Sequence, residues 1–186
     1  VISVDFKDRV NIFQKISYMA TIDNVDQLKN YYHYGLRSLR KRPFYTEDYE
    51  RQLEKAFEKR LAEISDMTVD QAKKQMDLVR DFKGLSNIVN DLLERSLDIG
   101  LSDEQKHRLN DLYELRKDSL KRDKLSEIDG ILGTIDDSQA LQDYWDSVKW
   151  YLQANRRFFG KEFEILIARK FDEQRGRIED RVSGAS

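Results

Sequence analysis

The sequence predicts an all-α fold, an elongated bundle of six or seven helices with a long, aromatic-rich C-terminal helix. Three observations lead to this prediction. Apolar residues recur at three- and four-residue steps in most segments, which is the spacing of one helix face. Proline occurs once and glycine eight times in 186 residues, so few residues interrupt a helix. The alternation typical of strands extends no further than residues 1–6.

The first quarter of the chain is predicted to form two helices and begin a third. The first spans about residues 5–20. The second begins after Asn24, a favourable N-cap residue, and ends before Pro43, because the residue preceding proline avoids helical backbone. Thr46 is the expected N-cap of the third helix, with acids in its first turn that suit the helix dipole. The apolar stripe of the first helix is Phe6, Val10, Phe13 and Ile16, and that of the third is Tyr49, Leu53, Phe57, Leu61 and Ile64.

Two capping boxes predict where the next helices begin. In a capping box, the first and fourth residues satisfy each other's backbone amides, as in Thr68–Gln71 and Ser102–Gln105. The helix from Thr68 either stops at Gly84 or continues to Asp98, and the helix from Ser102 ends at Gly130 or Gly133. The boxes lie 34 residues apart, a period of some helical repeats, but their flanking residues differ. We therefore favour two independent helix starts.

Residues from about Asp137 to Val182 are predicted to form one continuous helix. The segment contains no proline and both tryptophans, Trp145 and Trp150. We expect the rest of the chain to pack against this helix. Its large apolar residues follow helical spacing: Leu141, Tyr144, Trp145, Val148, Tyr151, Leu152, Phe158, Phe159, Phe163, Leu166, Ile167 and Phe171.

Length and composition set the broad class. We expect one helical domain over 1–182, with subdivision near 43–46 or 133–137 as an alternative, and a flexible tail at 183–186. The first residue is valine, which suggests processing or excision from a longer chain. The absence of cysteine excludes disulfides and thiolate chemistry but leaves the compartment open, with the cytoplasm slightly favoured over the periplasm. No apolar run approaches the ~20 residues of a membrane span.

No arrangement of residues predicts catalysis or metal binding. Glu104 and His107 form a Glu-x-x-His sequence, but bundle metal sites need a second copy, and Asn30 occupies the corresponding position before His33. Asp77 and Glu164 have apolar sequence neighbours, yet neighbours in a helix face different directions, so both are expected to point to water. Phosphate-binding loops and nucleophile motifs are absent from the sequence. We predict a non-enzyme without cofactor or metal.

Two segments, 31–45 and 149–161, combine basic and aromatic residues. This mixture suits single-stranded nucleic acid, anionic headgroups or an acidic protein. It also has a purely structural explanation, because basic residues complement a helix C-terminus and most of the rings fall on core stripes. The net charge of −2 provides no overall attraction to nucleic acid. The candidate basic patch is Arg37, Arg40, Lys41, Arg42, Arg156 and Arg157.

A few aromatic residues fall outside the predicted core stripes. Trp150 does not share a helix face with Trp145, and neither Tyr31 nor Tyr34 shares the face of Tyr32. A second apolar face means either that a helix lies centrally and is packed on both sides, which we favour, or that it meets a partner. The candidate partner-binding residues are Tyr31, Tyr34, Trp150 and Phe158.

These observations favour a non-catalytic helical domain that works by protein–protein contact, as an adaptor, assembly or signal-relay module. A protein partner or a homo-oligomer is the expected complex. The first alternative is a nucleic-acid-binding module that uses the two basic-aromatic segments. The second is a sensor or regulatory domain excised from a larger membrane receptor or enzyme, since helical bundles often enclose small ligands.

Overall fold

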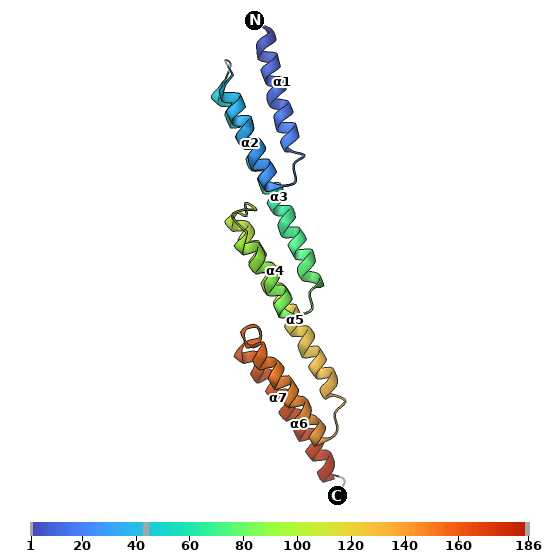
Figure 1. Cartoon of the computed structure of the whole chain (residues 1–186). Coiled ribbons are helices and arrows are strands. Elements are labelled where there is room, and N and C mark those ends of the chain that lie inside the picture. The colour runs from blue at the N-terminus through green and yellow to red at the C-terminus, as the bar shows by residue number, and fades with distance from the viewer. Residues whose placement is uncertain (1, 43–44, 185–186) are drawn as a thin grey trace. The chain divides into compact units, whose positions relative to one another are not determined.

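The computed structural model describes residues 2–42 and 45–184, with side chains from residue 11 onward. Helices and short connections make up these residues, which confirms the all-α class and the long C-terminal helix (Figure 1). The chain divides into two compact units, unit 1 over 1–77 and 87–112 and unit 2 over 78–86 and 113–186. The described residues contain seven helices: α1 (Ile2–Met19), α2 (Val25–Arg40), α3 (Glu47–Leu78), α4 (Phe82–Glu94), α5 (Asp103–Leu132), α6 (Ser138–Ala154) and α7 (Arg156–Gly184).

The core of unit 1 forms where α1 and α2 lie side by side and α3 packs against them (Figure 1). Its centre contains residues that are almost fully buried, among them Met19, Leu28 and Leu53. The stripe predicted for α1 is wrong at Phe13, which is 72% exposed, while its neighbour Ile12 is buried. Ile16 of the same stripe packs against the core as predicted, and Phe6 and Val10 lie outside the side chains described.

The predicted caps of α2 and α3 are confirmed. The side chain of Asn24 accepts a hydrogen bond of 3.0 Å from the backbone amide of Gln27. The hydroxyl of Thr46 lies 3.4 Å from the backbone amide of Tyr49. α2 ends at Arg40, shortly before the proline. Pro43 itself lies outside the described residues.

The prediction that a helix begins at Thr68 is wrong, because α3 continues through this position to Leu78. The Thr68 hydroxyl donates to the carbonyl oxygen of Ile64 at 2.9 Å, so it bonds within the helix and caps nothing. The buried stripe continues through Val69, Ala72 and Met76. Burial of this stripe outweighs the weaker local preference of threonine for a helix start.

Gly84 does not end a helix, because the break falls at residues 79–81 and Gly84 lies within α4. Asp81 is the cap that the sequence analysis missed, since its carboxylate accepts from the Gly84 amide at 2.7 Å. After α4, Gly100 adopts a φ of +68°, a left-handed conformation that favours glycine. The buried Ser65 hydroxyl lies 3.1 Å from the Gly100 carbonyl oxygen, which fixes this turn against α3.

The capping box at the start of α5 is confirmed. The Ser102 amide donates to Gln105 Oε1 at 2.9 Å, and the Gln105 amide donates to the Ser102 hydroxyl at 3.2 Å. Gln105 also donates to Asp66 on α3 at 2.9 Å, so the same residue ties α5 to α3 within unit 1. α5 ends at Leu132, next to Gly133, as predicted.

In unit 2, the segment predicted as one helix over 137–182 is two helices. α6 begins after the cap Asp137, and it ends at Ala154. α7 then starts at Arg156, and Gly160 interrupts its first turn with a φ of 73° and a ψ of 164°. α6 and α7 consequently lie side by side as a hairpin (Figure 1). α7 extends to Gly184, and the rest of the predicted tail, 185–186, lies outside the described residues.

Candidate interaction site on the hairpin of α6 and α7

The hairpin of α6 and α7 is held together by its buried aromatic residues. Phe171 is 1% exposed, and its ring centroid lies 5.5 Å from that of Tyr144 and 4.8 Å from that of Trp145. Near the turn, Phe159 lies 4.7 Å from Phe163 and 5.6 Å from Tyr151. These contacts fix the separation of the two helices and the direction of the side chains along their joint.

The C-terminal half of α5 covers one side of this hairpin. Lys124 Nζ lies 4.5 Å from the centroid of the Tyr151 ring, and Lys170 of α7 forms an ion pair with Asp129 at 2.8 Å. The Gln174 side chain donates to the carbonyl oxygen of Ile135 at 2.7 Å. Burial raises the pKa of Tyr151, and Glu127 and Asp81 add to this rise while Lys124 opposes it. This side of the hairpin is therefore occupied by the fold itself.

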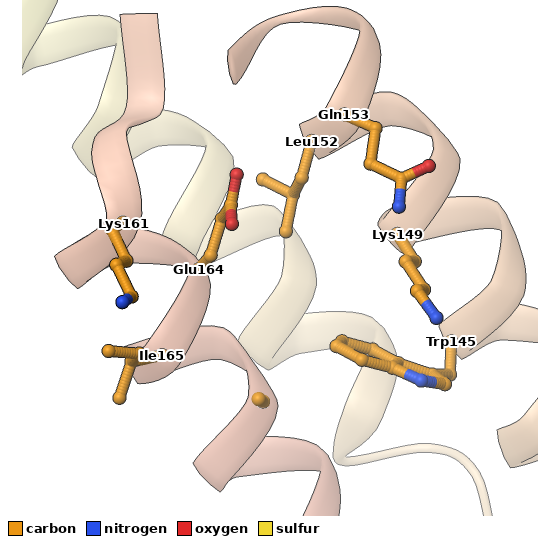
Figure 2. A pocket seen from close by; sticks show the side chains of 8 residues that line it. Trp145, Lys149, Leu152, Gln153, Lys161, Glu164 and Ile165 are labelled. Atoms are coloured by element: carbon orange, nitrogen blue, oxygen red, sulfur yellow. The ribbon is translucent and has the colours of Figure 1, made fainter.

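A pocket of about 280 Å³ lies between α6 and α7 and is lined by these two helices alone (Figure 2). Apolar parts of Trp145, Leu152 and Ile165 form much of its wall, and Lys149 and Lys161 stand on opposite helices. Ligand pockets for drug-sized molecules typically measure roughly 300–1,000 Å³. This pocket therefore has room for one large side chain or a small ligand. The lining residues are Trp145, Lys149, Leu152, Gln153, Lys161, Glu164, Ile165 and Ala168.

Glu164 contributes to the lining of the pocket and has one oxygen without a hydrogen-bond partner. Its side chain is 30% exposed, but Oε1 is buried and accepts no hydrogen bond. The nearest cation is Arg156, whose Nε lies 4.0 Å from this oxygen, beyond hydrogen-bond distance. The prediction that Glu164 points to water is therefore wrong for this oxygen. Asp77 does face water as predicted, with 54% exposure and an ion pair to Lys73.

The four candidate partner-binding residues have different environments. Trp150 and Tyr34 are 72% and 71% exposed, so central burial, the interpretation favoured from sequence, is wrong for both. Tyr31 is half-buried against Tyr18, with ring centroids 4.7 Å apart, and burial raises its pKa. Phe158 stacks on Phe82 of α4 at 4.9 Å. Tyr31 and Phe158 thus contribute to packing within their own units.

The six candidate basic residues are divided between the units, with four at the end of α2 in unit 1 and two at the start of α7 in unit 2. Arg40 pairs with Glu50 through two hydrogen bonds, and both nitrogens Nη1 and Nη2 of Arg42 reach the Asn11 side-chain oxygen when that amide is oriented to accept. Arg37 of α2 and Lys41, the residue that follows this helix, are exposed, and their spacing from Tyr34 places them on its side of the helix. Arg156 lies near Glu164 and Arg157 is exposed.

Sequence reasoning missed the pocket, although it had identified several of its residues. Trp145 and Leu152 were assigned to the buried face, and Lys149 and Lys161 to a basic cluster, because one straight helix would separate them. The signal in the sequence is the pair Asn155 and Gly160. Both residue types favour the ends of helices, and they lie five positions apart, which indicates a helix break. A helix break there folds 161–168 back against 145–153.

In 2–42 and 45–184, no three His, Cys, Asp or Glu side chains are grouped closely enough to hold a metal ion. Every described helix is too short or too polar to traverse a bilayer. No family model matches the chain, and no curated protein or solved structure shows significant similarity to it.

Proposed function

We propose that this chain is a non-catalytic helical domain that works by protein–protein contact, as an adaptor, assembly or signal-relay module. The hairpin of α6 and α7 is its contact surface. One observation carries the proposal: a pocket with apolar walls, two lysines and the Glu164 carboxylate in its lining lies on the same hairpin as the exposed Trp150. Exposed tryptophan is among the residues that dominate binding energy at protein interfaces.

The physical chemistry of the pocket favours a protein over a free small molecule. The Glu164 side chain lines the pocket and is 30% exposed, so its carboxylate can accept a hydrogen bond from a partner that enters. Insertion of a single large side chain buries the apolar walls, and Lys149 and Lys161 attract acidic residues beside it. A partner helix supplies all three features from one surface.

Photo-crosslinking tests this proposal. A photoreactive amino acid replaces Gln153, an exposed residue at the edge of the pocket, in the full chain expressed in its source cells. The matched control carries the same amino acid at Glu179, an exposed position of α7 outside the pocket lining. We expect one predominant protein adduct at position 153 and none at 179. Equal labelling at both positions, or a small molecule retained by the chain in native mass spectrometry, contradicts the proposal; the second result favours a sensor domain.

The exposed face of α2 supports a second candidate function, nucleic-acid binding. Tyr34, Arg37 and Lys41 follow helical spacing on this face, so a stackable ring stands next to two cations. We expect Arg37→Glu to abolish any shift of single-stranded oligonucleotides at about 50 mM salt, a permissive condition. Absence of a shift with the unmodified chain eliminates this candidate.

A further inference from the structure

Trp150 stands on the side of α6 opposite its buried stripe, and two acidic residues share its exposed face. Asp146 and Asp143 precede it by four and seven residues, on the same exposed face, where each receives a hydrogen bond only from a glutamine of its own helix. The indole ring offers a large apolar surface and a single N–H donor. A surface that combines a tryptophan with two carboxylates is complementary to a pocket that has apolar walls and two lysines.

The pocket has the complementary features. The Glu164 side chain lines the pocket and is 30% exposed, so its carboxylate can accept from a donor that enters, and the walls formed by Trp145, Leu152 and Ile165 favour an apolar group. Among the described residues, neither Lys149 nor Lys161 forms an ion pair, so both cations are available to carboxylates. Trp150 cannot reach the pocket of its own chain, because it faces away from the joint between α6 and α7.

We propose that Trp150 of one copy of this chain inserts into the α6–α7 pocket of a second copy. Its indole N–H donates to Glu164, and the carboxylates of Asp143 and Asp146 face Lys149 and Lys161. This inference rests on the proposed interaction function and names the partner. Each copy carries one Trp150 and one pocket, so two copies that exchange both contacts form a closed dimer.

Other exposed aromatic side chains fit the pocket less well. Phe13 is 72% exposed but has no donor for Glu164. Tyr18 and Tyr34 have hydroxyl donors, yet neither has an acidic residue three or four positions away on its helix to meet the two lysines of the pocket. Of the exposed rings in the described residues, Trp150 alone combines a donor with acidic neighbours.

Sedimentation of the full chain across the micromolar range tests the proposal. We expect the mean mass to rise with concentration and the association to weaken with salt, since ion pairs contribute. Trp150→Ala should weaken self-association about thirty-fold or more, the effect of truncating an interface hot spot. Asp146→Lys should weaken it, and Asp146→Lys combined with Lys149→Asp should recover part of the loss. Glu173→Lys, a matched reversal on an exposed position outside the pocket lining, should leave it unchanged.

Mixing two defective variants separates this contact from simple stacking of tryptophans. Ile165→Lys places a charged side chain in the apolar wall of the pocket, and it should fold because Ile165 is 46% exposed. Trp150→Ala keeps the pocket, and Ile165→Lys keeps the tryptophan, so their mixture should associate while neither does alone. A monomer at every concentration, or association unaffected by Trp150→Ala, overturns the proposal. A crosslink from position 153 to a different protein would still support the interaction function, so the two failures are distinguishable.

Discussion

Replacing Glu164 by leucine should stabilise unit 2, although it removes an ion-pairing group. A buried acceptor without a hydrogen bond costs about 1–3 kcal/mol. The Glu164 side chain is 30% exposed, so we take the lower end of this range. Arg156 is 75% exposed and 4.0 Å away, and such a surface pair contributes no more than about 1 kcal/mol. Leucine also adds apolar contact with the pocket wall and has a helix propensity close to that of glutamate.

The expected net gain is about 1 kcal/mol, which corresponds to a rise in Tm of about 2–4 °C for a chain of this size. Both tryptophans lie in unit 2, so thermal unfolding followed by tryptophan fluorescence reports on this unit. The measurement is made at low protein concentration, where self-association contributes little. Glu162→Leu, a substitution at an exposed neighbouring position, should change the stability by less than about 0.5 kcal/mol.

A lower Tm for Glu164→Leu, or a shift no larger than that of Glu162→Leu, would refute the reasoning that Glu164 is an unsatisfied group. If Glu164→Leu stabilises the fold and also abolishes self-association, Glu164 lowers the stability of the fold but contributes to binding. Such a trade-off is the usual mark of a functional position.

Three other substitutions test the fold and its pH dependence. Phe171→Ala should cost unit 2 about 3–5 kcal/mol, because it empties a fully buried site, and tryptophan fluorescence should show unfolding at a much lower temperature. Gly100→Ala should cost about 1–2 kcal/mol in denaturant unfolding, since alanine is strained at a φ of +68° and its Cβ would lie 2.8 Å from the Leu61 side chain. The pKa of Glu50 is lowered, chiefly by its hydrogen bonds from Arg40. The contribution of ionised Glu50 to the free energy of unfolding is therefore present above its unfolded-state pKa and is lost as the pH falls through its folded-state pKa. Glu50→Gln should make the free energy of unfolding depend less on pH in the acid range, and an unchanged dependence would contradict this.

The sequence alone determined the class of the fold and most of its local chemistry. Asn24, Thr46 and Ser102 cap helices as predicted, because a cap depends on residues within one turn of the chain. Leu141, Val148, Ile167 and Phe171 are buried as predicted, since helical periodicity records which face meets other helices. Of the candidate contact residues, Trp150 and Tyr34 were recognised because they fall outside that periodicity.

Tertiary packing decided where long helices continue and where they break. The capping box at Thr68 gave way to a buried stripe along α3, because burial of several side chains outweighs one local preference. At Asn155 and Gly160, in contrast, the helix breaks where the sequence predicted that it continues. The chain turns there, and the two halves of an apparently continuous apolar pattern pack on each other. The pocket and its unsatisfied Glu164 exist only because of that turn, since periodicity along a single helix carries no information about which residues of another helix lie opposite.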